Sequence, residues 1–445
     1  MQLVTLAIFC AVTLCSYVAS LHLAPAGFKY VPEGFSILLA AAVILAGPGQ
    51  RFRLIAPRYW LVFGALAVIA ACGGLINQLD PGPLIEGIRY YLRAIPMFFV
   101  PAIFAVSTKS IRTQLRLLLA LALAQIPVSV YQRYHVYSIG HNSGDSVFGT
   151  LMISSIESVF LICCICVGAA LALRGRLNKF VFLVLFVLLV IPTTINETKG
   201  SLFLLPIGLI TTLVVGSARG KRLRVGVAAV ALVGVFGALF IPIYDFFSTT
   251  NNQYPYTLED FFTNQKFVGH YLEKDAGVGT RGEVGRVDSI VVPLQHFADD
   301  PVHLMLGVGI GNASGVSLTG SSGHGAYYSL LGRYAECTSG ASFLIEIGVL
   351  GFSLVLLLYW LIARDAIMLA AHDRTILGAL ALGWVGVTSV ILLATFYKNI
   401  HAFDSLSYMF WYYSGVIAAA RTRLELSVAE EHSRLILSGA TGHHA

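Results

Sequence analysis

Long apolar stretches, separated for the most part by short polar ones, dominate the hydropathy pattern of this chain. Several reach about 20 residues, the length at which an α-helix crosses the hydrocarbon core of a bilayer, about 30 Å thick. The pattern predicts an all-α polytopic membrane protein with about twelve transmembrane helices. We expect them near residues 3–23, 33–47, 59–77, 84–106, 114–132, 148–173, 180–195, 201–216, 223–243, 343–363, 376–396 and 403–420.

One polar segment is much longer than the others. Residues 244–342, between the ninth and tenth predicted helices, hold ten of the 23 acidic residues. A loop of this length in a compact protein usually has a function. We therefore divide the chain into transmembrane helices 1–9 (residues 1–243), a large loop (244–342), transmembrane helices 10–12 (343–420) and a tail (421–445).

The positions of the basic residues predict how the helices are oriented. Of the 29 Lys and Arg residues, 18 fall in segments that are cytoplasmic if the amino terminus is inside, and 9 fall in the opposite segments. By the positive-inside rule, both termini and the tail are then cytoplasmic, and the large loop lies on the outer face of the membrane. The first apolar stretch lacks the positive start of a signal peptide, so we interpret it as a retained helix. With 57% hydrophobic residues, the net charge of +6 does not indicate nucleic-acid binding.

Two arginines, Arg89 and Arg93, lie inside the fourth predicted helix, where charged side chains are costly and commonly functional. Their spacing of four puts them on one helix face, and guanidinium groups match the geometry of phosphate. Alternatively, Glu86 pairs with Arg89, and Arg93 extends toward the interface. Lys199, in the outer turn between the seventh and eighth helices, is a third candidate cation.

The large loop adds Arg281 and Arg286 as candidate pyrophosphate ligands, just before or within a predicted amphipathic helix at about 284–298. We interpret Asp299–Asp300, which precedes a proline, as a helix terminus and not as a metal site. The run "GVGIG" at 307–311 lacks the strand and helix that a dinucleotide site needs. No metal site or disulfide framework is expected, because the histidine spacings fit no zinc pattern and six of the seven cysteines lie in apolar stretches.

Several stretches together resemble the O-antigen polymerase and ligase superfamily of envelope-glycan enzymes. They are "FKYVPEGFSILL", "LIEGIRYYLRAIPMFF", "LALAQIPVSVYQRY", "SVFGTL", "RVDSIVVPLQHFADDPVHLMLGVGIGN" and "FLIEIGVLG". Each motif alone is weak, but their order along residues 28–352, with one large loop before the tenth helix, strengthens the match. The resemblance implies a glycosyltransferase of the bacterial inner membrane that needs no cofactor or metal.

In such an enzyme the donor is a saccharide on undecaprenyl pyrophosphate, and an acceptor sugar hydroxyl attacks its anomeric carbon. Fixed cations then stabilise the departing pyrophosphate, a role we assign to Arg89, Arg93, Lys199, Arg281 and Arg286. The resemblance also implies contact with membrane lipid, and a flippase and chain-length regulators as partner proteins. It implies no nucleic-acid partner.

The chain departs from the family pattern at two positions. Lys199 stands where the family has an arginine, and Cys337 stands where ligases carry the histidine that is the candidate base. A neutral thiol is a poor base, so we assign that role to Glu336 or His324. We expect Glu346 to orient its neighbours or to pair with a buried arginine. The missing histidine favours a polymerase over a ligase.

Two other classes of function stay open. A flippase or carrier for lipid-linked sugars would show broken helices in matching halves. Pro96 and Pro101 supply one candidate break. The third hypothesis is a receptor or scaffold for envelope assembly. Such a protein has no evident use for the two arginines inside the membrane.

Overall fold

The computed structural model describes residues 2–45, 54–104, 106–138, 144–217, 220, 222–249, 257–264, 284–315 and 324–441. These residues form helices and no strand. The first half of the chain contains α1 (Gln2–Ser20), η1 (Ala26–Tyr30), α2 (Val31–Leu45), α3 (Pro57–Ile76), α4 (Pro81–Leu92), α5 (Pro96–Ile103), α6 (Thr108–Ser138), η3 (Gly144–Ser146), α7 (Ser154–Leu173), α8 (Lys179–Ile195) and α9 (Ser201–Gly216). The second half contains α10 (Arg222–Thr249), α11 (Leu258–Thr263), α13 (Asp288–His296), α14 (Pro301–Leu306), α15 (Tyr328–Cys337), α16 (Ser339–His372), α17 (Ile376–Tyr397) and α18 (Asp404–Thr441).

Among the described residues, eight helices are long and apolar enough to cross a membrane. They are α1, η1 together with α2, α3, α6, α7, α10, α16 and α17. The helices α8 and α9 are apolar but shorter. The prediction of an all-α polytopic membrane protein is confirmed, whereas the count of twelve crossings stays a prediction.

The core of the bundle contains α7, α16 and α17, together with residues 405–419 of α18. In the most apolar window of α7, α16 and α17, 67%, 61% and 72% of the residues are buried, against 17% for α3 and for α10. A helix that is apolar on every side can be surrounded by other helices, whereas an apolar helix at the periphery presents its side chains to lipid. These buried helices therefore form the scaffold that holds the polar segments described below.

The fourth predicted helix is not continuous. It divides into α4 and α5, which are separated at Arg93–Ile95, and α5 begins at Pro96. Proline lacks an N–H group and disfavours the helical conformation in the residue before it, so the chain restarts its helix there. The large loop also begins later than predicted, because α10 continues to Thr249.

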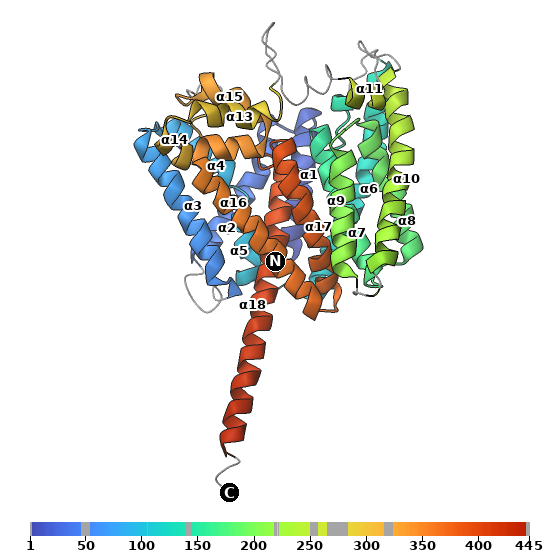
Figure 1. Cartoon of the computed structure of the whole chain (residues 1–445), viewed down its shortest axis with the longest axis vertical. Helices are drawn as coiled ribbons and strands as arrows, with labels where there is room; N and C mark the ends of the chain where they lie inside the picture. The colour runs from blue at the N-terminus through green and yellow to red at the C-terminus, as the bar shows by residue number, and fades with distance from the viewer. Residues whose placement is uncertain are drawn as a thin grey trace.

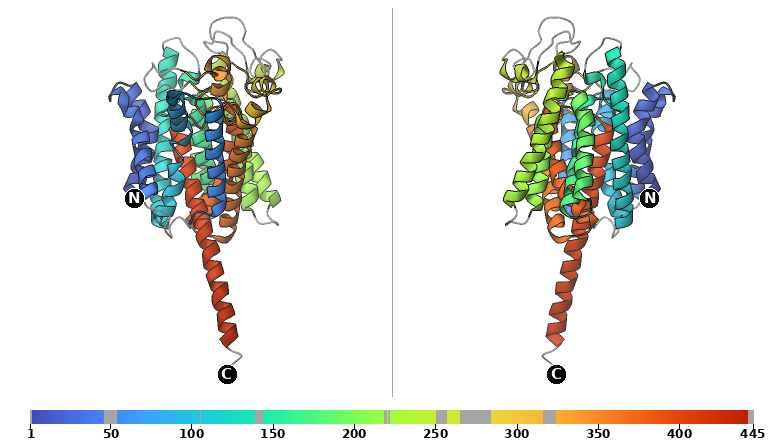
Figure 2. Two further views of the ribbon diagram at one scale, coloured as in Figure 1. Left: turned by 90° about the vertical axis from the view of Figure 1, so that its left-hand side faces the viewer. Right: turned by 90° about the vertical axis from the view of Figure 1, so that its right-hand side faces the viewer.

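The bundle has two different ends. The short helices α11, α13, α14 and α15 gather at one of them, which we call the upper end, and α18 projects beyond the opposite, lower end (Figures 1 and 2). At the lower end the α7–α8 turn contacts the α16–α17 turn through Arg176, which donates to the carbonyl oxygen of Arg374 at 2.7 Å. The ends of α3 and α16 are joined by an ion pair of 2.7 Å between Arg58 and Asp365. The contacts thus join segments predicted to be cytoplasmic.

Candidate functional site at the upper end

The large loop rejoins the bundle through a break in α16. Gly348, three turns into this helix, has a φ of +65°, in the left-handed region that glycine adopts without steric cost. The break frees the carbonyl oxygens of Ile345 and Glu346. These oxygens accept hydrogen bonds from the N–H groups of Val308 at 2.9 Å and Gly309 at 3.0 Å. The "GVGIG" run is therefore the segment that docks on the broken helix.

The carboxylate of Glu346 holds the same segment from inside. It is fully buried and accepts hydrogen bonds from the backbone N–H groups of Gly311 (3.0 Å), Ala313 (3.0 Å) and Ser314 (2.7 Å). Hydrogen bonds to a charged acceptor are the stronger kind. Of the two predicted roles for Glu346, the structure supports the first: it orients backbone neighbours and pairs with no arginine among the described residues.

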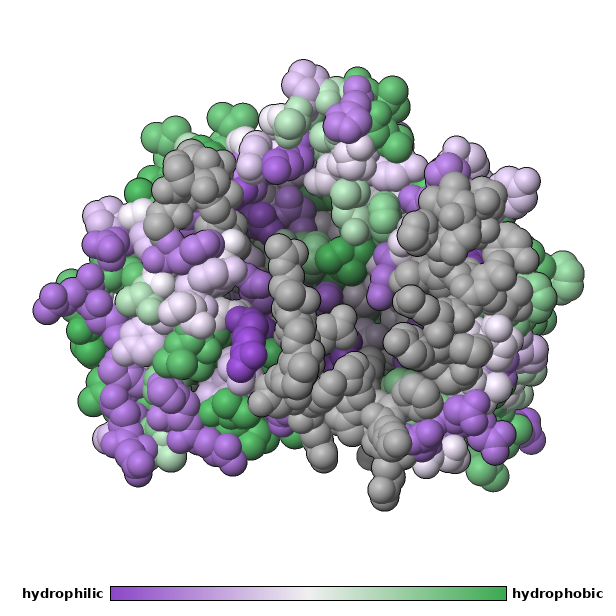
Figure 3. Space-filling model, turned by 90° about the horizontal axis from the view of Figure 1, so that it is seen from above, coloured by the Kyte–Doolittle hydropathy of each residue, from purple (hydrophilic) through white to green (hydrophobic). Residues whose placement is uncertain are grey.

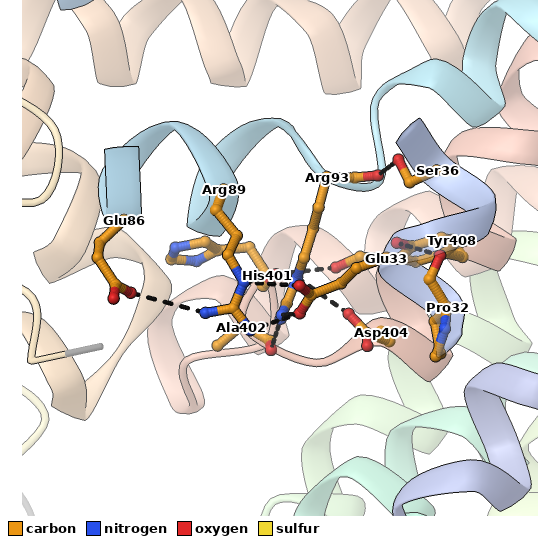
Figure 4. Close-up of polar contacts among 11 residues, drawn as sticks. Pro32, Glu33, Ser36, Glu86, Arg89, Arg93, His401, Ala402, Asp404 and Tyr408 are labelled. Carbon is orange, nitrogen blue, oxygen red and sulfur yellow. Dashed lines mark hydrogen bonds and ion pairs between the residues drawn. The ribbon is translucent and has the colours of Figure 1, made fainter. Parts of the chain in front are cut away.

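Arg89 and Arg93 lie in a cluster of carboxylates contributed by three parts of the chain (Figure 4). Arg89 donates two hydrogen bonds of 2.6 Å to Glu33 of α2 and lies 3.6 Å from Glu86. Arg93 lies 2.9 Å from Asp404 of α18 and 3.4 Å from Glu33. The alternative is therefore observed only in part: Arg89 lies beside Glu86, but Arg93 pairs with Asp404 and Glu33 and does not extend toward the interface.

This pairing changes what the two arginines offer to a ligand. Two guanidinium groups face three carboxylates, so the cluster carries no excess positive charge. Arg93 also donates to the carbonyl oxygen of Ala402, and its own carbonyl oxygen accepts from Ser36. These contacts tie α2, α4 and α18 together where the fourth predicted helix is interrupted. Direct binding of pyrophosphate by these arginines stays a prediction.

The turn between α17 and α18 connects this cluster to the start of α16. Ser339 accepts hydrogen bonds from the N–H groups of Ile400 (2.8 Å) and His401 (3.3 Å), and its hydroxyl lies 2.9 Å from Nδ1 of His401. The His401 ring stacks against Tyr91 and Phe343. Burial lowers the pKa of His401 to about 3, so the imidazole is neutral at physiological pH.

The segments of two predicted cations meet at Tyr397, the last residue of α17. The guanidinium carbon of Arg286 lies 5.6 Å from the centre of the Tyr397 ring, and the hydroxyl of that ring accepts from the N–H of Gly200 at 3.3 Å. Lys199, the residue before Gly200, lies 5.4 Å from the Tyr244 ring. A Cβ at Gly200 would lie 2.6 Å from Tyr397, so glycine is required for this approach.

The two candidate bases meet at another tyrosine. The ring of His324 stacks on Tyr328 with 3.9 Å between ring centres. The carboxylate of Glu336 raises the pKa of Tyr328, first by its charge and then by a hydrogen bond to the phenol. Both Glu336 and His324 are exposed, so each is accessible to solvent.

The bases and the cations belong to neighbouring parts of the loop. Helix α13, which begins two residues after Arg286, packs against α15, which ends one residue after Glu336. The Sγ atom of Cys337 lies 3.5 Å from the carbonyl oxygen of Val284. Cys337 thus joins these two segments. Seen from above, the upper end is hollowed near its middle, with hydrophilic side chains in the wall (Figure 3).

Two other sequence predictions concern the loop. Asp300 caps α14 and accepts from the N–H of His303 at 3.2 Å, which confirms that the acidic pair marks a helix terminus. Within the described ranges, no group of three or more His, Cys, Asp or Glu side chains is arranged to hold a metal ion. Arg281 lies outside the described residues.

Sequence reasoning missed several residues of this region: Glu33, Tyr397, His401 and Asp404. A signal existed for two of them, because the polar stretch "YKNIHAFD" contains His401, in the predicted outer turn, and Asp404, at the start of the twelfth predicted helix. Tyr397 gave no such signal in the sequence, because tyrosine is common at membrane interfaces.

An apolar cavity of about 400 Å³ lies below this region, between α3, α4, α16 and α18. Tyr90 and His401 are among its lining residues, and the remainder are mainly aliphatic or aromatic. A cavity of this size and character fits an extended apolar group.

No protein-family model matches the chain, and no curated protein is significantly similar to it.

Proposed function

We propose that this protein is a polysaccharide polymerase that transfers a glycan from undecaprenyl pyrophosphate to an acceptor sugar, at the periplasmic face of the bacterial inner membrane and without a metal. One observation carries the proposal: Lys199 and Arg286, chosen from distant segments of the sequence, both lie beside aromatic rings at the upper end, and their segments meet at Tyr397. The segment of Arg286 also contacts the segment that carries Glu336.

The chemistry needs a base and a cationic site at this end of the bundle. The acceptor hydroxyl attacks the anomeric carbon of the donor, forming a new C–O bond, and its proton passes to Glu336 or His324. The bond from that carbon to the pyrophosphate breaks, and the leaving oxygen keeps the electron pair. Positive charges held in fixed positions stabilise this oxygen as its charge develops, the role proposed for Lys199 and Arg286.

The position of Glu336 suits it as the base. An exposed carboxylate can accept a proton from a substrate hydroxyl, and its contact with Tyr328 fixes its position. His324, whose ring stacks on the same tyrosine, Tyr328, is the second candidate base. The apolar cavity beside Tyr90 and His401 offers space for part of the polyprenyl chain.

The decisive experiment uses the purified full chain in proteoliposomes with labelled undecaprenyl-pyrophosphate oligosaccharide. The native protein should release undecaprenyl pyrophosphate and form longer glycans. Arg286→Ala and Lys199→Ala should each reduce turnover at least about 100-fold, the scale of one group that stabilises developing charge. Arg333→Ala, which removes an exposed arginine stacked on its neighbour Tyr334 at the same end, should leave turnover unchanged.

Arg89 and Arg93 are less suitable for this test. Replacing Arg93 leaves Asp404, which is 2.9 Å away, without its cation. Loss of activity in that variant would then follow from a structural change as readily as from a lost substrate contact. Normal turnover in both Arg286→Ala and Lys199→Ala would refute the enzyme proposal.

A ligase and a transporter give different products in the same assay. A ligase transfers the glycan to a lipid or protein acceptor and does not lengthen it on its carrier. A transporter moves the intact lipid without breaking a bond.

One observation favours the transporter: helices are broken in both halves of the chain, between α4 and α5 and at Gly348 of α16. However, the carbonyl oxygens freed at Gly348 accept from Val308 and Gly309, so the break holds the loop segment in place. This occupancy keeps the glycosyltransferase as the preferred function.

A further inference from the structure

The bundle contains a second and larger cavity, of about 710 Å³, whose lining extends from Arg176 and Thr375 at the lower end to Leu406 near the start of α18. Its walls come from α6, α7, α8, α17 and α18, and they consist mainly of leucine, isoleucine, valine and phenylalanine side chains. It reaches along α17 from Ile376 to Ile391, a rise of about 22 Å at 1.5 Å per residue. Half of a bilayer core is about 15 Å thick. The cavity is therefore long enough for an acyl chain of one leaflet.

One end of this apolar cavity is cationic. Arg112 and Arg116 of α6 and Arg176 of the α7–α8 turn line it, and no acidic residue is among the described residues that do so. All three are exposed, and none forms an ion pair within the part of the chain that the structure describes. Arg112 and Arg116 are four residues apart on one helix face, where like charges repel. An anion placed between them would relieve that repulsion.

Two helix ends add to the positive potential at this mouth. Thr108, the first residue of α6, and Thr375, the N-cap of α17, both line the cavity. The amino-terminal ends of helices carry partial positive charge and favour anions. The carboxylate of the adjoining α16–α17 turn, Asp373, accepts from the backbone N–H of Thr375 at 2.6 Å and does not line the cavity.

We propose that this cavity binds an anionic phospholipid of the leaflet at the lower end. The phosphate of the head group lies between Arg112, Arg116 and Arg176, and one acyl chain extends between α7, α8 and α17. A basic mouth on a deep apolar cavity fits this amphiphile. A free phosphate would leave the apolar part unfilled, and a neutral lipid would leave the arginines unmatched. The site is separate from the chemistry proposed for the upper end.

The test is native mass spectrometry of the purified full chain, titrated with dioleoyl phosphatidylglycerol, dioleoyl phosphatidylcholine or sn-glycerol 1-phosphate. The native protein should retain phosphatidylglycerol in preference to both other probes. Arg112→Ala/Arg116→Ala should retain it roughly 30-fold more weakly, the effect expected of two basic residues at a membrane surface. Arg224→Ala/Arg364→Ala removes two other exposed arginines that do not line the cavity and should bind as the native protein does.

A third variant tests the acyl chain separately from the charge. Leu119→Trp fills part of the cavity while leaving all three arginines in place, and it should also lose the lipid. Equal retention of phosphatidylglycerol by the native protein and by Arg112→Ala/Arg116→Ala would overturn the proposal. So would unchanged retention by Leu119→Trp, or binding of sn-glycerol 1-phosphate as strong as that of the intact lipid.

Discussion

Replacing Glu346 removes the acceptor of three buried backbone hydrogen bonds in one step. In Glu346→Ala, the N–H groups of Gly311, Ala313 and Ser314 lose their partner. Each buried donor left without an acceptor costs about 1–3 kcal/mol, so the total is about 3–9 kcal/mol. This is comparable with the whole free energy of unfolding of many proteins, about 5–15 kcal/mol. The variant should therefore fold poorly or not at all.

The conservative variant gives a finer measurement. In Glu346→Gln the amide oxygen can still accept from Ala313 and Ser314, which share Oε1 in the native protein, whereas the amide nitrogen faces the N–H of Gly311. One lost acceptor predicts a cost of about 1–3 kcal/mol. Glu336→Gln changes an exposed carboxylate at the same junction and should alter stability by less than about 0.5 kcal/mol.

The assay is equilibrium unfolding in mixed micelles with increasing SDS, followed by circular dichroism and by the monodisperse peak in size-exclusion chromatography. The expected order of stability is native, nearly equal to Glu336→Gln, then Glu346→Gln, then Glu346→Ala. If both Glu346 variants unfold at the same SDS mole fraction as the native protein, the Glu346 carboxylate does not stabilise the 307–314 segment. The role assigned to it, holding "GVGIG" on α16, is then wrong.

Three further predictions concern other contacts. Asp365→Asn removes the charged partner of the 2.7 Å ion pair between α16 and α3 and should cost about 1.5–3 kcal/mol in the same unfolding assay, the range for a hydrogen bond to a charged group; a native unfolding curve would refute this. Burial lowers the pKa of His401 to about 3, below the value of about 6.5 in an unfolded chain. Only the unfolded state then takes up a proton as the pH falls below that value. The native protein should lose thermal stability between pH 7 and pH 4, and His401→Gln should lose less; equal losses would contradict the assignment. Gly200→Ala should displace Tyr397, 2.6 Å from the new Cβ, and reduce glycan release, whereas Gly220→Ala, with nothing within 4 Å, should not.

The helical, membrane-embedded character of the fold could be predicted because it depends on the length of apolar stretches, a local property. Pro96 indicated that the fourth helix could be interrupted. Whether the interruption bends the helix or divides it depends on which groups surround the backbone there. The fold brings Arg93 together with Asp404, 311 positions later in the chain. No spacing rule in the sequence indicates such a pair.

The candidate site was predictable in its charged members and not in its arrangement. Arg89 and Arg93 were conspicuous as charges in an apolar helix, but their neutralisation depends on Glu33 from α2 and on Asp404. Tyr397 became relevant only when the structure placed both Arg286 and Gly200 against it. These contacts depend on how distant segments pack against each other. Composition and periodicity describe only local sequence and do not predict them.

The break at Gly348 has a consequence for the order in which the protein is made. Residues 307–314 leave the ribosome before α16, yet their backbone N–H groups bind acceptors that belong to α16. Until α16 has entered the bilayer, these groups can bond only to water or to chaperones. Closure of the upper end is therefore a late event in biogenesis. A chain truncated before Glu346 should leave residues 307–314 accessible to added protease, even when the helices that precede them are already inserted.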